Sequence, residues 1–197
     1  FLLIWVLFRN MFGAGLIKLR GDSCWKDLTC LFYHFETQPL PNPMSPLFHH
    51  LPRWTLKGGV LFNHFVELLV PFGLLLTAPF RIVAGLFTAL FQIVLIISGN
   101  LSWLNWLTLI LCIPCFDDRI WRRLIPSSWL TKVPLETHFS LYSGMTQFIL
   151  IALGLLIALL SIQPIKNFFS ARQAMNTSYD PFHLVNSYGA FGSVGKR

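Results

Sequence analysis

Long apolar runs dominate this sequence and restrict its fold more than any other feature. The clearest run extends from Tyr142 to Ile162, with strongly polar residues only near its ends. A helix needs about 20 apolar residues to cross roughly 30 Å of hydrocarbon. Only 12% of the 197 residues are charged, about half of the proportion that is usual in soluble domains. We therefore predict an all-α polytopic membrane protein.

We predict about five transmembrane helices in this chain. They occupy residues 1–19, three spans within residues 60–116, and residues 142–163. Residues 20–59 are predicted to form a long lumenal or interfacial loop, in which a long helix is excluded by Pro39, Pro41, Pro43, Pro46 and Pro52. Residues 117–141 are predicted to form a cytosolic loop, and residues 164–197 the start of a lumenal C-terminal domain. Both ends interrupt a pattern, so we expect a fragment of a longer protein.

The positive charges favour one orientation in the membrane. Basic loops usually face the cytosol, and the loop after the fourth predicted span contains Arg119, Arg122, Arg123 and Lys132. Alternation of the spans then places residues 20–59 and the tail in the lumen, although residues 20–59 also contain basic side chains. The tail contains the sequon Asn176-Thr177-Ser178, which predicts a glycan on Asn176. The basic residues form no single stripe, so we expect no nucleic-acid partner.

Polar residues interrupt the apolar runs, and we predict a polar cluster within the membrane. Its candidate members are Arg9, Asn63, His64, Glu67, Asn100 and Asn105. Residues 63, 64 and 67 share one helical face because they are three and four residues apart. The cluster either packs helices together or faces a substrate. Lys18 likewise has two interpretations, a lysine that extends to the membrane surface or a base at the mouth of a cavity.

The four cysteines form two pairs with different expectations. Cys24 and Cys30 lie in the predicted lumenal loop, where they can form a structural disulfide, remain buried thiols or take part in redox chemistry. Cys112 and Cys115 form a C-x-x-C motif in an apolar run, which favours helix packing over a redox or zinc pair. The six histidines lack any metal-ligand spacing, so we expect no metal site.

Several long motifs extend over nearly the whole chain. They are LIKLRGDSCWKDLTCLFYHFETQPLPNP, HHLPRW, FNHFVELLVPF, SGNLSWLNWLTL, FDD and NSYGAFGSV. This set resembles the lipase maturation factors, and RGD-x-CW-x-DLTC and SGNLS-x-LNWLT are closer to the type 1 than to the type 2 members. The resemblance implies a multi-pass glycoprotein of the endoplasmic reticulum membrane. It would act in lipid metabolism as a chaperone rather than as an enzyme, without a cofactor.

The resemblance also implies the partners of such a factor. Besides membrane lipid, these are lipoprotein lipase, hepatic lipase and endothelial lipase, whose folding, dimer assembly and secretion it would assist. Lumenal segments are associated with client binding in the family, which directs attention to the loop after the first span. The candidate client-binding residues in this loop are Trp25, Tyr33, His34, Glu36, His49, His50 and Trp54.

A second resemblance is local and suggests an alternative function. Ala14, Gly15, Lys18 and Leu19 form the pattern A-G-x-x-K-L. This pattern resembles the segment of vitamin K-dependent gamma-carboxylases that contains their catalytic lysine. The alternative is therefore a multi-span membrane enzyme of gamma-carboxylase-like type, in which Lys18 acts as the base.

Overall fold

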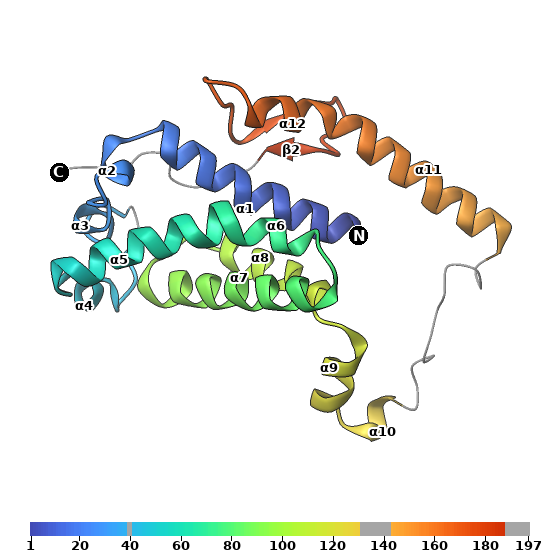
Figure 1. Ribbon diagram of the computed structural model, residues 1–197, viewed down its shortest axis with the longest axis horizontal. Coiled ribbons are helices and arrows are strands. Elements are labelled where there is room, and N and C mark those ends of the chain that lie inside the picture. The colour runs from blue at the N-terminus through green and yellow to red at the C-terminus, as the bar shows by residue number, and fades with distance from the viewer. Residues whose placement is uncertain (39–40, 131–142, 188–197) are drawn as a thin grey trace.

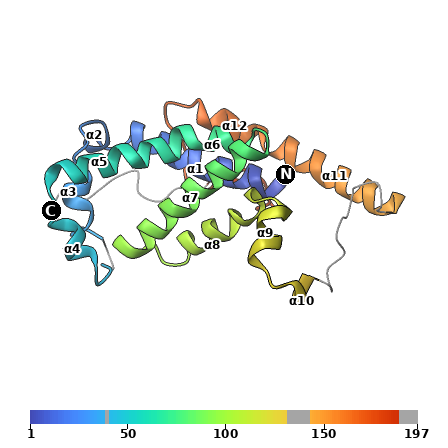
Figure 2. The ribbon, with the colours of Figure 1, turned by 60° about the horizontal axis from the view of Figure 1, so that its bottom comes forward.

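The computed structural model describes residues 1–38, 41–130 and 143–187, and most of its regular structure is helical (Figure 1). A bundle is formed by α1 (Leu2–Arg20), α5 (Arg53–His64), α6 (Val70–Leu74), α7 (Ala78–Ser98) and α8 (Leu104–Leu111). Figure 2 shows the same helices side by side from a second direction. The facing sides of the bundle bury large apolar residues such as Leu7, Val66, Leu74 and Phe91. A turn of 3-10 helix, η2 (Ile113–Cys115), follows α8.

One turn of π-helix, η1 (Phe65–Leu69), joins α5 and α6 into a continuous helical segment. Pro71 explains this local change, because proline has no N–H to donate to the carbonyl four residues earlier. That carbonyl belongs to Glu67, and the proline ring also crowds it. The α-helical hydrogen bond at Glu67 is therefore lost, and a wider turn replaces it. Within this turn Val66 and Glu67 are buried.

The connecting segment comprises residues 21–52, and its described residues, 21–38 and 41–52, pack at one end of the bundle (Figure 1). Their short helices are α2 (Ser23–Lys26), α3 (Leu31–His34) and α4 (Ser45–His49). Asn42 Nδ2 donates to the carbonyl of Ile96 at 3.0 Å, and Ser45 Oγ donates to the carbonyl of Ser98 at 2.9 Å. Such carbonyls in a last helical turn have no partner within the helix. The segment therefore caps α7, and it ends at Pro52 because α5 begins at Arg53.

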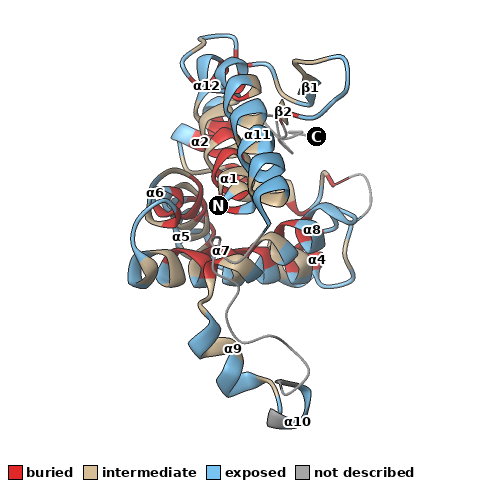
Figure 3. Cartoon of the chain, turned by 90° about the vertical axis from the view of Figure 1, so that its right-hand side faces the viewer, coloured by how far each residue is buried: buried red, intermediate tan, exposed pale blue. Residues whose placement is uncertain are grey.

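Three helical segments are long and apolar enough to cross a membrane: Leu2–Arg20, Ala78–Ser98 and Gly144–Phe168. The last consists of α11 (Gly144–Leu160) and α12 (Ile162–Phe168). The predicted count of about five is not confirmed, because residues 53–74 contain the π turn and Leu104–Cys115 is shorter. Figure 3 shows buried residues where the bundle helices face one another, whereas α11 is largely exposed. An exposed apolar helix of this length is what lipid would surround.

The segment after α12 packs against α1. Arg20 Nη2 donates to the carbonyl of Phe168 at 2.6 Å, and Gln173 Nε2 donates to the carbonyl of Gly13 at 3.0 Å. A short antiparallel pair follows, β1 (Thr177–Ser178) with β2 (Asn186–Ser187). The first contact places the C-terminal end of α1 beside the end of α12, and the second places Gln173 beside the middle of α1.

The predicted cytosolic loop contains α9 (Asp118–Leu124) and α10 (Ser127–Leu130) in its described part. The Asp117 side chain begins α9 by accepting a hydrogen bond from the backbone N–H of Ile120 at 3.3 Å. Residues 131–141 of this predicted loop, Tyr142 of the predicted fifth span and residues 188–197 of the predicted C-terminal domain lie outside the described residues.

Gly15 allows α1 to approach η1 closely. A Cβ atom at this position would lie 2.7 Å from Leu68 Cδ2 and 2.9 Å from Glu67 Cβ. Contacts this short require one of the helices to shift. The absence of a side chain at residue 15 therefore sets the distance between α1 and the turn that contains Glu67.

Gly15→Ala is expected to lower the free energy of unfolding by about 1–3 kcal/mol, because overpacking in a tight interface costs about this much. Gly58→Ala is the matched control, since nothing lies within 4 Å of a Cβ atom there. Alanine in an open helical position is better than glycine by roughly 0.5–1 kcal/mol. Thermal unfolding of the two purified variants in detergent measures the difference. Equal melting temperatures would contradict the close packing at Gly15.

Candidate functional site

A buried ion pair joins α1 to the π turn. Lys18 Nζ lies 2.6 Å from Glu67 Oε1 and donates to Asn63 Oδ1 at 2.8 Å. Asn63 Nδ2 in turn donates to Glu67 Oε2 at 2.9 Å. The side chains of Lys18 and Glu67 are only 8% and 5% exposed. These residues, the Lys18 cluster, form a closed set in which each member hydrogen-bonds to the other two.

Local structure explains why these side chains meet. Gly15 lies three residues before Lys18 and allows the two helices to approach. Asn63 and Glu67 are four residues apart, so they share a face of the helical segment. Removing two charges from water costs several kcal/mol per ion, and mutual attraction with further hydrogen bonds offsets that cost. Asn63 supplies those hydrogen bonds to both charged groups.

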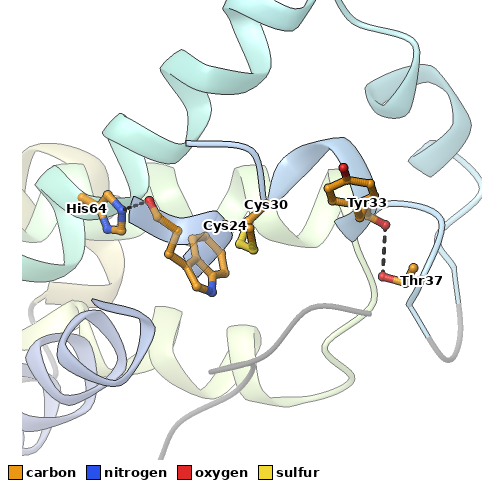
Figure 4. The surroundings of a disulfide bond; sticks show 6 residues. Cys24, Cys30, Tyr33, Thr37 and His64 are labelled. Atoms are coloured by element: carbon orange, nitrogen blue, oxygen red, sulfur yellow. Dashed lines mark hydrogen bonds between the residues drawn. A yellow bond between two sulfur atoms is a disulfide. The ribbon is translucent and has the colours of Figure 1, made fainter. Parts of the chain in front are cut away.

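The connecting segment covers the Lys18 cluster. The Trp25 ring centroid lies 4.9 Å from Lys18 Nζ, a cation–π distance. Trp25 is 3% exposed, and its carbonyl lies 3.0 Å from His64 Nε2. A disulfide joins Cys24 to Cys30 beside it, so the turn that contains Trp25 is closed covalently (Figure 4). Trp25 thus separates the ammonium of Lys18 from solvent.

A cavity of about 320 Å³ lies beside the Lys18 cluster. Small-molecule sites in proteins usually enclose roughly 300–1,000 Å³. Its walls come from α1, the connecting segment, α5, η1, α7 and α8, and from Asn176 of the segment after α12. Most of the lining is apolar, and the polar lining residues include Lys18, Asn63, Glu67, His34, Gln92 and Asn105. The volume and the lining suit a hydrophobic ligand with a small polar part.

The structure brings together only some of the residues predicted for the polar membrane cluster. Asn63 and Glu67 contact Lys18, and Asn105 lines the same cavity. His64 faces the Trp25 carbonyl, whereas Asn100 is exposed and its side chain accepts from the backbone N–H of Ser102. Arg9 lies elsewhere, with Nη1 3.5 Å from the carbonyl of Asn186.

The residues predicted to bind a client also divide into two groups. Trp25 is buried, while Tyr33 and His34 are half-buried and His34 lines the cavity. The remaining four lie nearer the surface. Glu36 is exposed and lies 3.0 Å from His49, and His50 and Trp54 are exposed. Asn176 of the predicted glycosylation site is exposed as well. The outward group is therefore the one that a partner can reach.

Two further predictions concern cysteines and metals. Cys112 and Cys115 are buried free thiols, and a Cβ atom at Gly85 would lie 2.5 Å from Cys115 Cβ. These cysteines pack η2 closely against α7. In the part of the chain that the structure describes, three or more His, Cys, Asp or Glu side chains nowhere gather to hold a metal ion.

Sequence reasoning raised a cavity beside Lys18 as one interpretation but did not predict the residues of its wall. Ala14, which was named only for its motif, and Thr108, which was not named, both line the cavity. Ala14 is four residues before Lys18 and so shares its helical face. A small residue at that spacing from a buried lysine was the available signal. The contact of Trp25 with Lys18 had no comparable signal, because it depends on how the connecting segment folds.

The Lys18 cluster surrounds the amino group of Lys18 with hydrogen-bond acceptors and an aromatic ring. Lys18 donates to Glu67 and Asn63 and faces the Trp25 ring. These contacts join α1 to the π turn through Lys18. The alternative enzyme mechanism, in which Lys18 acts as a base, stays a prediction.

Comparison with known proteins decides the family. The sequence profile of the lipase maturation factor transmembrane domain matches residues 1–123. The chain is 49% identical to lipase maturation factor 1 of Mus musculus and 46% identical to that of Homo sapiens, each over 98% of this chain and 36% of the relative. It is 38% identical to lipase maturation factor 2 of Mus musculus over 76% of this chain and 22% of the relative. The chain belongs to the lipase maturation factor family.

Family membership confirms the resemblance seen in the sequence, including its closer match to type 1. The chain spans about a third of the length of the lipase maturation factor 1 proteins that it matches. No solved structure matches it. The Lys18 cluster and most of the cavity wall lie within the matched transmembrane domain, so these features belong to the membrane part of a lipase maturation factor.

Removing one charge of the buried pair is expected to destabilise this lipase maturation factor domain. Lys18→Met or Glu67→Leu alone should cost about 3–5 kcal/mol, because either change leaves an uncompensated buried charge. The double variant should recover most of that loss. The control is Glu36→Gln, which alters an exposed pair whose contribution is about 0–1 kcal/mol. Thermal unfolding in detergent gives the comparison, and additive losses in the double variant would contradict the pairing.

His34 predicts a pH-dependent stability. Burial, and then the nearby charge of Lys18, lower the pKa of His34 from 6.5 to about 4. Above pH 6.5 the residue is neutral in both the folded and the unfolded chain, so its contribution is constant. Between pH 6.5 and 4 only the unfolded chain binds the proton, and the free energy of unfolding falls by at most about 1.4 kcal/mol per pH unit.

Melting temperatures measured from pH 7.5 to 5 test this expectation. His34→Phe should flatten the decline at low pH, whereas His50→Phe, at an exposed position, should leave it unchanged. Parallel curves for the wild type and His34→Phe would show that His34 is not the responsible group.

Proposed function

We propose that this chain is the membrane core of a factor in the endoplasmic reticulum that assists the folding, dimer assembly and secretion of lipoprotein lipase, hepatic lipase and endothelial lipase. The observation that carries this proposal is the match of residues 1–123 to the lipase maturation factor transmembrane domain. The names of the relatives describe lipase maturation, and the chain covers about a third of their length. The function proposed for this chain is therefore part of the function of a longer protein.

Five crossings of the membrane agree with the contacts between helix ends. Arg20 at the end of α1 contacts Phe168 at the end of α12, and Asn42 of the connecting segment contacts the end of α7. The connecting segment and the segment after α12 then share one side, while α9 and α10 belong to the other. In this arrangement residues 53–74 and Leu104–Cys115 serve as the second and fourth spans.

The disulfide supports a lumenal position for the shared side. Disulfides persist in the lumen of the endoplasmic reticulum and are rare in the cytosol. Cys24 and Cys30 are buried and joined, and the exposed Asn176 lies on the same side in this arrangement. A glycan on Asn176 would then face the lumen. The lumenal side is also the side on which newly made lipases fold.

The exposed residues of this lumenal side form the proposed client surface. Trp54 is 77% exposed at the start of α5, and Glu36 and His50 are exposed in the connecting segment. Aromatic residues are enriched at protein interfaces. Trp25 and His34 have structural positions instead, against Lys18 and in the cavity wall. The client surface is therefore narrower than the sequence predicted.

Site-specific photocrosslinking in the full-length protein tests this surface. Benzoylphenylalanine at residue 54 should crosslink to newly made lipoprotein lipase in the endoplasmic reticulum. The matched control is residue 106, because Trp106 is also exposed, at 56%, but lies on α8 where lipid would surround it.

We expect lipoprotein lipase to crosslink to residue 54 and not to residue 106. Crosslinks from residue 54 to unrelated proteins alone, or equal lipase crosslinking from both positions, would contradict the proposed client surface.

A further inference from the structure

The cavity beside the Lys18 cluster is lined by two buried amide side chains. Asn105 is 4% exposed, and its side chain forms no hydrogen bond within the part of the chain that the structure describes. Gln92 is also 4% exposed, and among the described residues its Nε2 hydrogen-bonds to Met11 Sδ alone, at 3.6 Å. Both amides therefore retain the capacity for a further hydrogen-bond partner. Both side chains line the cavity, where a bound molecule can supply that partner.

Gln92 and the Lys18 cluster lie at different depths of the cavity. Gln92 contacts Met11, which precedes Lys18 by seven residues on α1, or about 10 Å along a helix. The wall also contains apolar side chains such as Phe62, Phe91 and Leu95. A ligand that fills the cavity therefore contacts both amide groups and hydrocarbon.

The charges of the cavity wall cancel among the described residues. Lys18 is paired with Glu67, and His34 is neutral at physiological pH. A carboxylate or phosphate head would find no unpaired cation in this wall. The amides of Gln92 and Asn105 instead offer both donors and acceptors, which suits hydroxyl and carbonyl oxygens.

One wall of the cavity reaches the outer surface of the bundle. Val94 of α7 and Leu104 of α8 both line the cavity, and they are 37% and 39% exposed. These two helices lie side by side in the apolar part of the bundle (Figure 2). A hydrophobic molecule can therefore reach the cavity from the surrounding lipid. The volume of about 320 Å³ is near the lower end of the range for small-molecule sites, which favours one hydrocarbon chain over two.

We propose that this cavity binds one uncharged single-chain lipid of the monoacylglycerol class. Its hydroxyl and ester oxygens hydrogen-bond to Gln92 and Asn105, and its chain lies along the apolar wall. This site is separate from the outward-facing client surface and goes beyond the proposed role in lipase maturation.

Photolabelling of the purified full-length protein in lipid nanodiscs tests the proposal. The probe is a monoacylglycerol with a diazirine in its chain, and mass spectrometry maps the labelled peptides. Labelling should concentrate on the cavity-lining parts of α1, α7 and α8. Unlabelled monoolein should compete at a concentration at least tenfold lower than oleate or dioleoylphosphatidylcholine.

Two pairs of variants connect the labelling to the cavity. Gln92→Leu/Asn105→Leu should reduce labelling about tenfold, whereas Gln163→Leu, at an exposed position on α12, should not. Ala14→Phe should block labelling by filling the cavity, whereas Ala152→Phe, on the exposed face of α11, should not. The melting temperature separates loss of binding from loss of fold. Leucines that replace these amides should leave that temperature unchanged or raise it.

Several results would overturn the proposal. Labelling spread evenly over the exposed face of α11 would indicate bulk lipid contact only. Equal competition by oleate would show that the site accepts a charged head group. Unchanged labelling of the Gln92→Leu/Asn105→Leu variant would show that the two amides do not bind the lipid. Native mass spectrometry that detects no bound single-chain lipid, or a ring compound in place of an acyl chain, would exclude the assigned lipid class.

Discussion

The ion pair between Lys18 and Glu67 is the interaction on which the rest of the bundle depends. A charge in apolar surroundings is tolerated only when an opposite charge and hydrogen bonds compensate for lost water. Lys18 meets this condition through Glu67 and Asn63, with Trp25 over its ammonium. The pair fixes α1 against the π turn, and that contact determines where the neighbouring helices and the connecting segment can lie.

The connecting segment is part of this bundle. Its disulfide closes the turn that places Trp25 over Lys18, and Asn42 and Ser45 hydrogen-bond to the last carbonyls of α7. Polar groups of the segment therefore satisfy groups that the helices expose at their ends. Because the inner side of the connecting segment packs against the helices, only its outward-facing residues can contact a partner. This division gives the connecting segment a fixed inner side and a limited outer contact surface.

The sequence predicted a helical membrane protein, because an apolar run as long as Tyr142 to Ile162 has few stable structures other than a transmembrane helix. It also placed Asn63 and Glu67 on one helical face, because that relation is local. It did not predict the π turn, which depends on how Pro71 acts within a packed segment, or the inward position of Trp25 and His34. The separation of Arg9 and Asn100 from Lys18 likewise depends on tertiary packing, which spacing along one helix does not specify.

Lysine footprinting of the purified protein tests the buried ion pair most directly. Acetylation by a water-soluble reagent, followed by mass spectrometry, compares Lys18 with the exposed Lys26 and Lys57 in the same sample. We expect Lys26 and Lys57 to be modified while Lys18 stays unmodified until the protein unfolds. Modification of native Lys18 at the rate of Lys57 would contradict a buried pair with Glu67, and with it the arrangement of the bundle.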